Sequence, residues 1–302
     1  MQSTSNILMI RPVAFGFNPQ TEGNTFQHDM ESEKVQEKAL AEFNALVTKL
    51  RLNHVNVIVI EDTLQPHTPD SIFPNNWVSF HKNGSVYVYP MQAENRRNER
   101  RDDILDVLST QFNITEINDL TFTEDHEQYL EGTGSMVLDR ENKIAYACLS
   151  IRTHQKALDI FCNESGYSAL TFHGVDENSN PIYHTNVMMC VAEKFVVICL
   201  ESIPDFTERE QLIDSFKKTG KEIIEISFAQ MNNFAGNMLE VKNTFNQTFL
   251  VMSENAKNSL NKDQIVQINQ YAEILSSPIP TIEKIGGGSA RCMMAEIHLE
   301  KR

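Results

Sequence analysis

Among the five cysteines of the chain, Cys292 has the neighbours that suit a nucleophile. It follows the segment GGGSAR (residues 286–291) and precedes a short run typical of a strand. Glycines allow a ligand to approach backbone amides closely, and a charge on Arg291 that pointed inward would favour the thiolate of a neighbouring thiol. A structural turn remains the alternative. A phosphate-binding loop is disfavoured because no Lys-Ser/Thr pair follows. The other cysteines lie in apolar runs, where buried small side chains are expected: Cys148, Cys162, Cys190 and Cys199.

A thiolate nucleophile needs a histidine and an acid that orients it. His184, in PIYHTNVMMCV, directly precedes an apolar strand-like run. Asp70 lies in TPDSIFPNNW, and Glu131 lies in LEGTGSM, before a Gly-x-Gly turn. The alternatives are a surface histidine and turn carboxylates that bind local amides. A metal site from these three residues is unsupported, because the chain has no H-E-x-x-H and no short-range pair of ligands.

Composition limits the classes of partner. The 302 residues include 41 acids against 26 Lys and Arg, and the net charge of -15 disfavours nucleic acids and anionic membranes. An odd cysteine count without C-x-x-C disfavours a disulfide framework or a structural zinc site. The first residues lack the charged and apolar regions of a signal peptide, and no apolar run is long enough to span a membrane. We therefore expect a cytoplasmic protein.

The elements that must position these residues repeat along the chain. Helical periodicity predicts five helices, at about 30–52, 98–110, 154–166, 207–220 and 261–277. Thr153 and Thr207 are the expected N-caps of the third and fourth, and Asn261 and Pro278 bound the fifth. Short β-rich runs lie between the helices, many of them as adjacent pairs, and they include 7–10, 55–60, 86–89, 136–138, 144–148, 188–191, 195–200, 222–226, 248–252 and 293–297. The spacing suggests a strand–strand–helix–strand repeat, five times over, within a single domain spanning residues 1–302. An ordinary α+β domain with fortuitous spacing is the alternative.

Four of these segments, in this order, resemble the guanidino-group-modifying superfamily, the penteins, which includes arginine deiminase, dimethylargininase and the amidinotransferases. The segments are PDSIF near position 70, LEG near 131, HTN near 184 and the glycine loop with Cys292. Further segments are similar to the arginine deiminase-related or citrulline utilization hydrolase group. They span residues 9 to 294: MIRPVAFGFN, GNTFQ, FPNNWVSFH, LEGTGSMVLDR, HTNVMMCV, GNMLEV and GGGSARCM.

The resemblance implies an α/β fold, a five-bladed propeller of ββαβ units with pseudo-fivefold symmetry. It also implies a hydrolase that acts on a guanidino or ureido carbon through a covalent cysteine adduct, without a metal or another cofactor. By motif match, Cys292 is the nucleophile, His184 the general acid and base, and Glu131 the partner of His184. Asp70 and Asn186 are implied to lie in the substrate-binding pocket.

Two positions concern the substrate. Dimethylargininase-like members have an acid six residues after the first Asp, where this chain has Asn76. A neutral amide removes an ion pair with a guanidinium, so we expect a ureido substrate such as citrulline, or a modified guanidine. The alternative is that another acid binds a cationic substrate. Arg96 and Arg97 stand where related enzymes bind the substrate carboxylate, and we expect Arg97 in that role, although a solvated charge run is an equal alternative.

Other functions within and outside this chemistry remain open. An amidinotransferase would pass the amidino group to an amine instead of water. A non-catalytic pentein that binds another molecule has no need for Cys292, His184 and Glu131 together. A papain-type hydrolase is disfavoured because its cysteine lies near the N-terminus. The expected partner is a small guanidino or ureido amino acid, with homo-oligomerisation left open.

Overall fold

The chain forms five small sheets of one repeated pattern. A computed structural model describes residues 1–21 and 34–302. Within that part, each sheet has three strands, with the middle strand antiparallel to one neighbour and parallel to the other. The sheets are β15 (Ala295–Glu296), β1 (Asn6–Arg11) and β2 (Asn56–Glu61); β3 (Val78–Phe80), β4 (Ser85–Val88) and β5 (Glu116–Asp119); β6 (Met136–Asp139), β7 (Ile144–Cys148) and β8 (Ser168–Phe172); β9 (Met189–Val191), β10 (Phe195–Ile198) and β11 (Glu222–Glu225); and β12 (Leu239–Lys242), β13 (Thr248–Ser253) and β14 (Glu273–Ser277).

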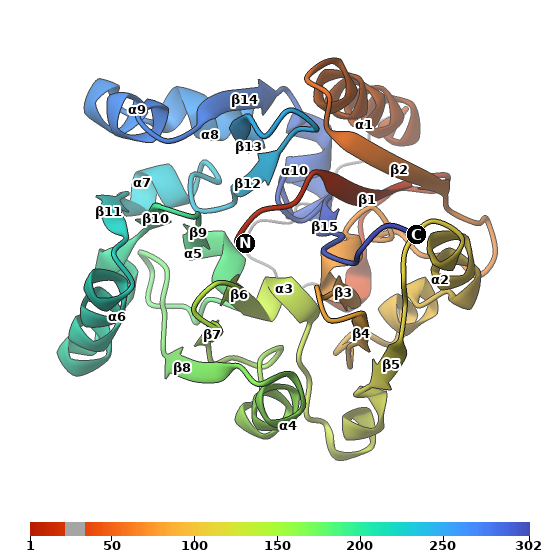
Figure 1. The fold of residues 1–302 in the computed structure, drawn as a ribbon, viewed down its shortest axis with the longest axis horizontal. Coiled ribbons are helices and arrows are strands. Elements are labelled where there is room, and N and C mark those ends of the chain that lie inside the picture. Colours follow the sequence, from red (N-terminus) through yellow and green to blue (C-terminus); the bar gives the residue numbers. More distant parts are fainter. Residues whose placement is uncertain (22–33) are drawn as a thin grey trace.

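Helices connect the parallel strands, because a parallel pair needs a crossover rather than a tight hairpin. Figure 1 shows the sheets around the centre of the molecule and these helices outside them. The crossover helices are α1 (Val35–Leu52), α2 (Asp102–Ser109), α4 (Gln155–Ser165), α6 (Phe206–Lys218), and α8 (Glu254–Ser259) with α9 (Lys262–Asn269). In the part of the chain described, none is both long and apolar enough to cross a membrane.

Each crossover helix covers its sheet with one apolar face. In α1, Ala39, Phe43, Leu46 and Leu50 recur at helical spacing and are fully buried. Burying a side chain the size of Phe43 contributes about 2 kcal/mol. The middle strand β10 is apolar on both faces, and all four of its residues are buried. Such strands must have a layer on each side, which the outer helix and the molecular centre supply.

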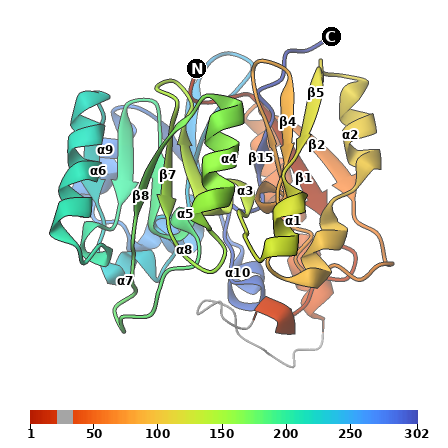
Figure 2. The same cartoon turned by 90° about the horizontal axis from the view of Figure 1, so that it is seen from below.

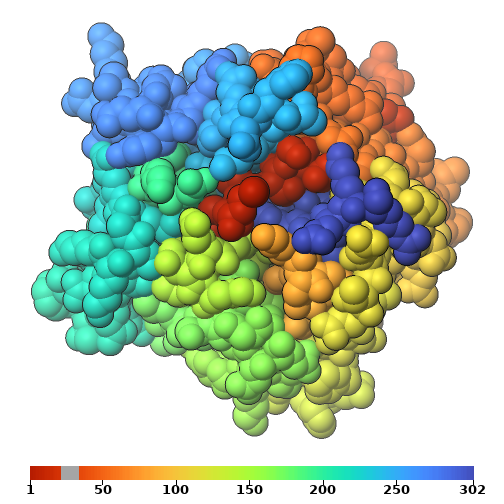
Figure 3. All heavy atoms as spheres, viewed as in Figure 1, coloured from red at the N-terminus to blue at the C-terminus, as the bar shows by residue number. Residues whose placement is uncertain are grey.

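The last strand of the chain completes the first sheet. β15 pairs with β1, with Ile7 opposite Glu296 and Leu8 opposite Ala295. The two ends of the chain consequently lie close together, and Figure 3 shows the N-terminal and C-terminal segments meeting in the middle of one face. This pairing joins the first and last parts of the sequence into one sheet.

Short helices precede the first strands of several sheets, and they lie away from the chain ends. These are η2 (Pro74–Asn76) before β3, α3 (Gly132–Ser135) before β6 and α5 (Thr185–Met188) before β9, while α10 (Pro280–Gly286) leads into the glycine loop before β15. In Figure 2 the chain ends lie at one face and α10 lies toward the other. The segments that precede the first strands of different sheets, such as η2, α3 and α5, therefore lie next to one another although they are far apart in the sequence. The remaining helices are η1 (Pro19–Thr21), η3 (Glu94–Glu99), η4 (Thr121–His126), η5 (Leu200–Ser202) and α7 (Phe228–Met231).

Several expected boundaries differ from the structure. The N-caps are His154 and Asp205, each of whose side chains accepts a backbone N–H, rather than Thr153 and Thr207. The fifth helix ends at Asn269, because Leu275 belongs to β14; the apolar spacing of helix and strand happens to run on without a break. The expected start of the first helix near Met30 and the GNTFQ segment lie outside the described residues.

Candidate active site

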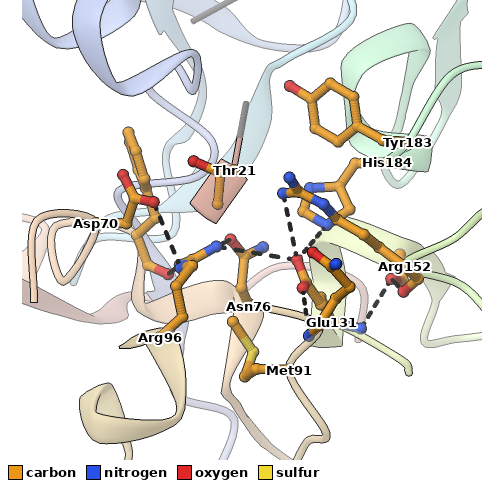
Figure 4. A network of polar contacts seen from close by, with 12 residues as sticks. Thr21, Asp70, Asn76, Met91, Arg96, Glu131, Arg152, Tyr183 and His184 are labelled. Atoms are coloured by element: carbon orange, nitrogen blue, oxygen red, sulfur yellow. Dashed lines mark hydrogen bonds and ion pairs between the residues drawn. The ribbon is translucent and has the colours of Figure 1, made fainter. Parts of the chain in front are cut away.

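One narrow pocket collects residues from segments that adjoin all five sheets. It is lined by Thr21, Asp70, Phe73, Asn76, Arg96, Arg152, Tyr183, His184, Asn186, Val187, Phe234, Asn237, Gly286, Gly287, Gly288 and Cys292. Four of the residues singled out from the sequence therefore lie beside Cys292 in the pocket wall: Asp70, Asn76, His184 and Asn186. Figure 4 shows how the polar side chains converge from different elements.

Glu131 lies directly behind His184. Its Oε2 is 2.8 Å from His184 Nε2, and both side chains are almost fully buried. The backbone N–H of Gln92 donates to the other carboxylate oxygen, at 3.0 Å. Burial disfavours the charge on Glu131, but Arg152 nearby and the hydrogen bond with His184 outweigh burial and lower the pKa of Glu131 to about 2. Glu131 is therefore an anion that fixes the orientation and tautomer of His184.

The imidazole of His184 rests in its neutral form near pH 7. Burial lowers the pKa of His184 below its usual value, and the charges of Arg152 and Arg96 act in the same direction, whereas Glu131 acts against them. Because the neutral ring donates Nε2–H to Glu131, its Nδ1 carries the lone pair. That nitrogen is the one able to accept a proton.

The thiol of Cys292 is held by two asparagines. Asn237 Nδ2 lies 3.2 Å from Cys292 Sγ, and Asn186 Nδ2 lies 3.5 Å from it. Asn237 also donates to the carbonyl of Asn186 at 2.9 Å and accepts from the backbone N–H of Arg291 at 3.1 Å. The Asn237 amide thus connects the loop that contains Cys292 to the short helix α5, which follows His184. Amide donors aimed at sulfur stabilise a thiolate without a neighbouring cation.

Arg291 does not face this thiol, contrary to the role considered from the sequence. Its guanidinium pairs with Glu296 at 2.7 Å and donates to the carbonyl of Met294 at 2.9 Å. The buried carboxylate of Glu296 attracts the side chain toward the molecular centre, so only the backbone of Arg291 contributes to the cysteine loop.

The opposite wall of the pocket contains Asp70, Asn76 and Arg96. Arg96 forms a two-pronged pair with Glu99, at 2.8 Å and 2.9 Å, and donates to Asn76 Oδ1 at 2.9 Å. Asp70 lies 3.8 Å from Arg96 and accepts a hydrogen bond from Asn18. Burial raises the pKa of Asp70 against the lowering effect of Arg96. Arg96 also lies 3.9 Å from Glu131, so an arginine occupies the space between these two carboxylates, and they do not converge on a common metal position.

The expectation that Arg97 binds substrate is not supported by its position. Arg97 is absent from the pocket lining, donates to the carbonyl of Met91 at 3.1 Å, and lies 3.3 Å from Glu124. Neighbouring residues of the short helix η3 point in different directions. Arg96 therefore faces the pocket, whereas Arg97 points away from the pocket. One residue of sequence therefore separates a pocket residue from a partly exposed ion pair.

Comparison with known families identifies the chain. A family model described as N,N dimethylarginine dimethylhydrolase, eukaryotic, matches residues 11–299. The chain belongs to this family. The dimethylargininase family is one of those in the guanidino-group-modifying superfamily, as the ordered segments around Asp70, Glu131, His184 and Cys292 indicated. The search of curated protein sequences returned no relative.

Solved structures share the fold across almost the whole chain. ArgZ, an arginine dihydrolase from the ornithine–ammonia cycle in cyanobacteria, is 18% identical with a TM-score of 0.75, over 98% of this chain and 40% of that one. Unliganded AgrE is 19% identical with a TM-score of 0.74, over 98% and 40%. A dimethylarginine dimethylaminohydrolase variant in adduct with S-methyl-L-thiocitrulline is 14% identical with a TM-score of 0.65, over 98% and 100%. The chain thus spans about two fifths of the ArgZ and AgrE chains.

In this member of the dimethylargininase family, several buried polar atoms of the pocket residues have no hydrogen bond to residues 1–21 or 34–302, the part of the chain that the structure describes. They are Asp70 Oδ1, Asn76 Nδ2, Arg152 Nε and Asn186 Oδ1. Buried polar atoms without partners are costly, and they are expected where a ligand supplies the missing partner. Two of these atoms are acceptors and two are donors, so the ligand they suit must both donate and accept hydrogen bonds.

Sequence reasoning missed several pocket residues, among them Arg152, Tyr183 and Asn237. Asn237 had a detectable signal, because it precedes the first strand of a sheet as Glu131, His184 and Cys292 do. The Tyr183 hydroxyl donates to the carbonyl of Gly287 at 3.1 Å, and the Arg152 guanidinium lies 5.0 Å from the Tyr183 ring centre. No local pattern marks those two, since their importance comes from contacts between distant segments.

Proposed function

We propose that this protein hydrolyses a C–N bond of a guanidino or ureido group in an arginine- or citrulline-like amino acid, through a covalent adduct on Cys292. The observation that supports this most strongly is the shared pocket of Cys292 and His184, with Glu131 bonded to His184 at 2.8 Å. A nucleophile, a base and an orienting acid in that arrangement form the minimal machinery for covalent catalysis. Membership of the dimethylargininase family and the names of the similar structures support the same chemistry.

The first half of the reaction forms the adduct. Neutral His184 accepts the proton of the Cys292 thiol at Nδ1, and the thiolate, held by Asn186 and Asn237, attacks the planar carbon of the substrate. A carbon–sulfur bond forms, and the electron pair of the π bond moves to the attached heteroatom. As that pair returns, the carbon–nitrogen bond breaks, and protonated His184 gives its proton to the leaving amine.

The second half regenerates the thiol. His184, neutral again, takes a proton from water, and the hydroxide attacks the carbon of the thiouronium or thiocarbamate adduct. The carbon–sulfur bond breaks, and the thiolate is reprotonated by His184. Throughout both halves, anionic Glu131 stabilises the transient positive charge on His184, as its position behind Nε2 allows.

Asn76 favours a ureido over a guanidino substrate. Its Oδ1 is already used by Arg96, which leaves the buried Nδ2–H as the group that a substrate can meet. A donor matches a carbonyl oxygen and repels the N–H groups of a guanidinium. The partnerless oxygens of Asp70 and Asn186 can accept N–H groups of either substrate class. We therefore propose a citrulline-like ureide as the preferred class.

We further propose that residues 1–302 form one catalytic domain. Its fold is a five-bladed α/β propeller with pseudo-fivefold symmetry. The five sheets of equal topology support that description. In such an arrangement the first strand of each blade starts near the central axis, which accounts for the convergence of Asn76, Glu131, His184, Asn237 and Cys292.

The deciding experiment measures amine or ammonia release by the wild type and by Cys292→Ala. The panel contains citrulline, arginine, dimethylarginine and agmatine, each with and without an acceptor amine. We expect turnover of a ureide by the wild type, its loss in Cys292→Ala, and wild-type rates in the matched control Cys162→Ala, whose thiol lies in α4. Turnover that survives in Cys292→Ala would falsify the covalent mechanism, and turnover that depends on the acceptor amine would identify a transferase.

A further inference from the structure

A second cavity lies away from the active-site pocket. It is lined by the hairpin between β3 and β4, the hairpin between β6 and β7, and the segment after β15. We call it the rear cavity, and its lining residues are Met1, His81, Lys82, Asn83, Arg140, Lys143, Tyr167 and His298. The chain ends lie on this face in Figure 2, opposite α10 and the glycine loop that follows it.

The rear cavity concentrates positive charge in an acidic protein. Three of its lining residues are cations, Lys82, Arg140 and Lys143, and none of the lining residues is an acid, although the chain as a whole has a net charge of -15. Such a local excess of one sign attracts ligands of the opposite sign. The total charge of the chain therefore gives no indication of what this cavity can bind.

The cations are held in place within the cavity wall. The Lys143 ammonium lies 4.4 Å from the centre of the Tyr167 ring, a contact that orients the side chain. Arg140 is fixed by Glu296 at 3.5 Å and by the carbonyl of Phe80 at 3.5 Å. Partial burial lowers the pKa of Lys143, and the like charge of Arg140 lowers it further. The positive charges of Lys143 and Arg140 repel each other, and a bound anion would reduce this repulsion.

A buried histidine adds an independent sign of a ligand. Among the residues that the structure describes, none forms a hydrogen bond with the buried Nε2 of His298, and a carboxylate oxygen of Glu296 lies 3.6 Å from it. An imidazole nitrogen without a partner costs free energy unless something fills its hydrogen-bonding capacity. The side chain lies in the same wall as Arg140 and Lys143, so one anion can meet all three groups.

We propose that the rear cavity binds a phosphate group, either as inorganic phosphate or as the phosphomonoester of a small metabolite. A phosphate has a charge of about -1.5 to -2 at pH 7 and several acceptor oxygens, which match two ammonium groups, one guanidinium fork and an imidazole. A single carboxylate has half that charge and two oxygens, and leaves part of the cluster unpaired. The proposal does not depend on the reaction at Cys292.

The rear cavity lies at the far ends of strands whose near ends hold the active site. β3 (Val78–Phe80) lies between Asn76 and His81, β6 (Met136–Asp139) lies between Glu131 and Arg140, and β15 lies between Cys292 and His298. At the rise of a strand, residues 78 and 81 alone are separated by about 10 Å. A phosphate would therefore bind too far from Cys292 to touch the substrate, and its binding is expected to persist in Cys292→Ala.

The test compares two double variants of equal charge change. Lys82→Ala with Lys143→Asn removes both ammonium groups; Asn is chosen because residue 143 has a φ of 56°, which Asn tolerates. The matched control is Lys217→Ala with Lys218→Ala, at the end of α6. Calorimetric titration at low ionic strength measures the binding of inorganic phosphate and of a phosphomonoester, with acetate as the carboxylate arm.

We expect saturable phosphate binding by the wild type and by the control, weakened about tenfold or more in the rear-cavity variant. Tighter binding of the phosphomonoester would identify an organic phosphate as the ligand, and equal binding would identify the free ion. No saturable binding by the wild type, equal loss in both double variants, or unchanged binding in the rear-cavity variant would each overturn the proposal.

Discussion

At the residue scale, Asn76 is the position that most directly tests the substrate class. Asn76→Asp keeps an oxygen for Arg96 and replaces the partnerless N–H with an acceptor. An acceptor that faces a ureido oxygen leaves a buried group unpaired and costs about 1–3 kcal/mol, so kcat/KM for citrulline should fall about 10- to 100-fold, whereas that for arginine should rise. Steady-state kinetics on both substrates measure the change, and Asn83→Asp, in the rear cavity, is the control. If kcat/KM fell equally for citrulline and arginine, Asn76 would not select between the two substrates.

Glu131 provides a second residue-scale prediction, from its effect on His184. Glu131→Gln keeps the shape and a hydrogen bond but removes the charge that raises the pKa of His184. That pKa, already below 6.5, should fall further, and the acid limb of kcat/KM should move to lower pH. The maximum rate should fall about 100-fold, because the positive charge on His184 loses its counterion. The pH–rate profile shows both effects, with the exposed Glu254→Gln as control. An acid limb that moves to higher pH contradicts this assignment.

At the element scale, the short helix α3 fits tightly between other catalytic segments. A Cβ at Gly134 would lie 2.3 Å from Asn76 Nδ2 and 3.0 Å from the His184 ring, whereas a Cβ at Gly16 would meet nothing within 4 Å. Gly134→Ala should therefore displace Asn76 and His184 and lower kcat/KM about 100-fold with the fold intact, because small misplacements of catalytic groups are costly. Gly16→Ala should retain wild-type rates. Kinetics with circular dichroism test this, and an active Gly134→Ala would show that the segments can adjust.

The same scale shows what the sequence could predict. Periodicity located the crossover helices α1, α2, α4, α6 and α9 but not α8, and apolar runs located strands such as β1, β7 and β10. The runs did not include β3, β5, β8, β12 or β14. β3 is short, β5 and β8 carry exposed residues, and the predicted fifth helix covers β14. Periodicity could not end the fifth helix, because Ala272 and Leu275 happen to continue its spacing into β14.

Residues that line the pocket were predictable where a motif marks them, and unpredictable where contacts between distant segments place them. Cys292, His184, Asp70, Asn76 and Asn186 all line the pocket, and Glu131 lies behind it. The choice between Arg96 and Arg97 depends on which side of η3 faces inward, and that follows from the ion pairs with Glu99 and Glu124 rather than from local sequence.

At the scale of the whole molecule, a buried ion network joins the last strand of the chain, β15, to the loop that contains Cys292 and to the end of β6. Glu296, in β15, lies 2.7 Å from Arg291 of the cysteine loop and 3.5 Å from Arg140 at the end of β6. These charges hold the pKa of Glu296 well below its usual value despite burial. Because β15 completes the first sheet, this carboxylate stabilises both the closure of the fold and the position of Cys292.

Removing the charge of Glu296 should lower the free energy of unfolding of the whole protein. Glu296→Gln leaves two buried guanidinium groups without their counterion, which costs about 3 kcal/mol. A carboxylate whose pKa is lowered on folding stabilises the folded state above its unfolded pKa of 4.5 and loses that contribution as pH falls. The stability difference between wild type and variant should therefore be full at pH 7 and shrink below about pH 4.5. Urea unfolding across pH measures it, with the exposed Glu300→Gln as control. A difference that stays constant with pH would mean that lost packing, not lost charge, destabilises the variant.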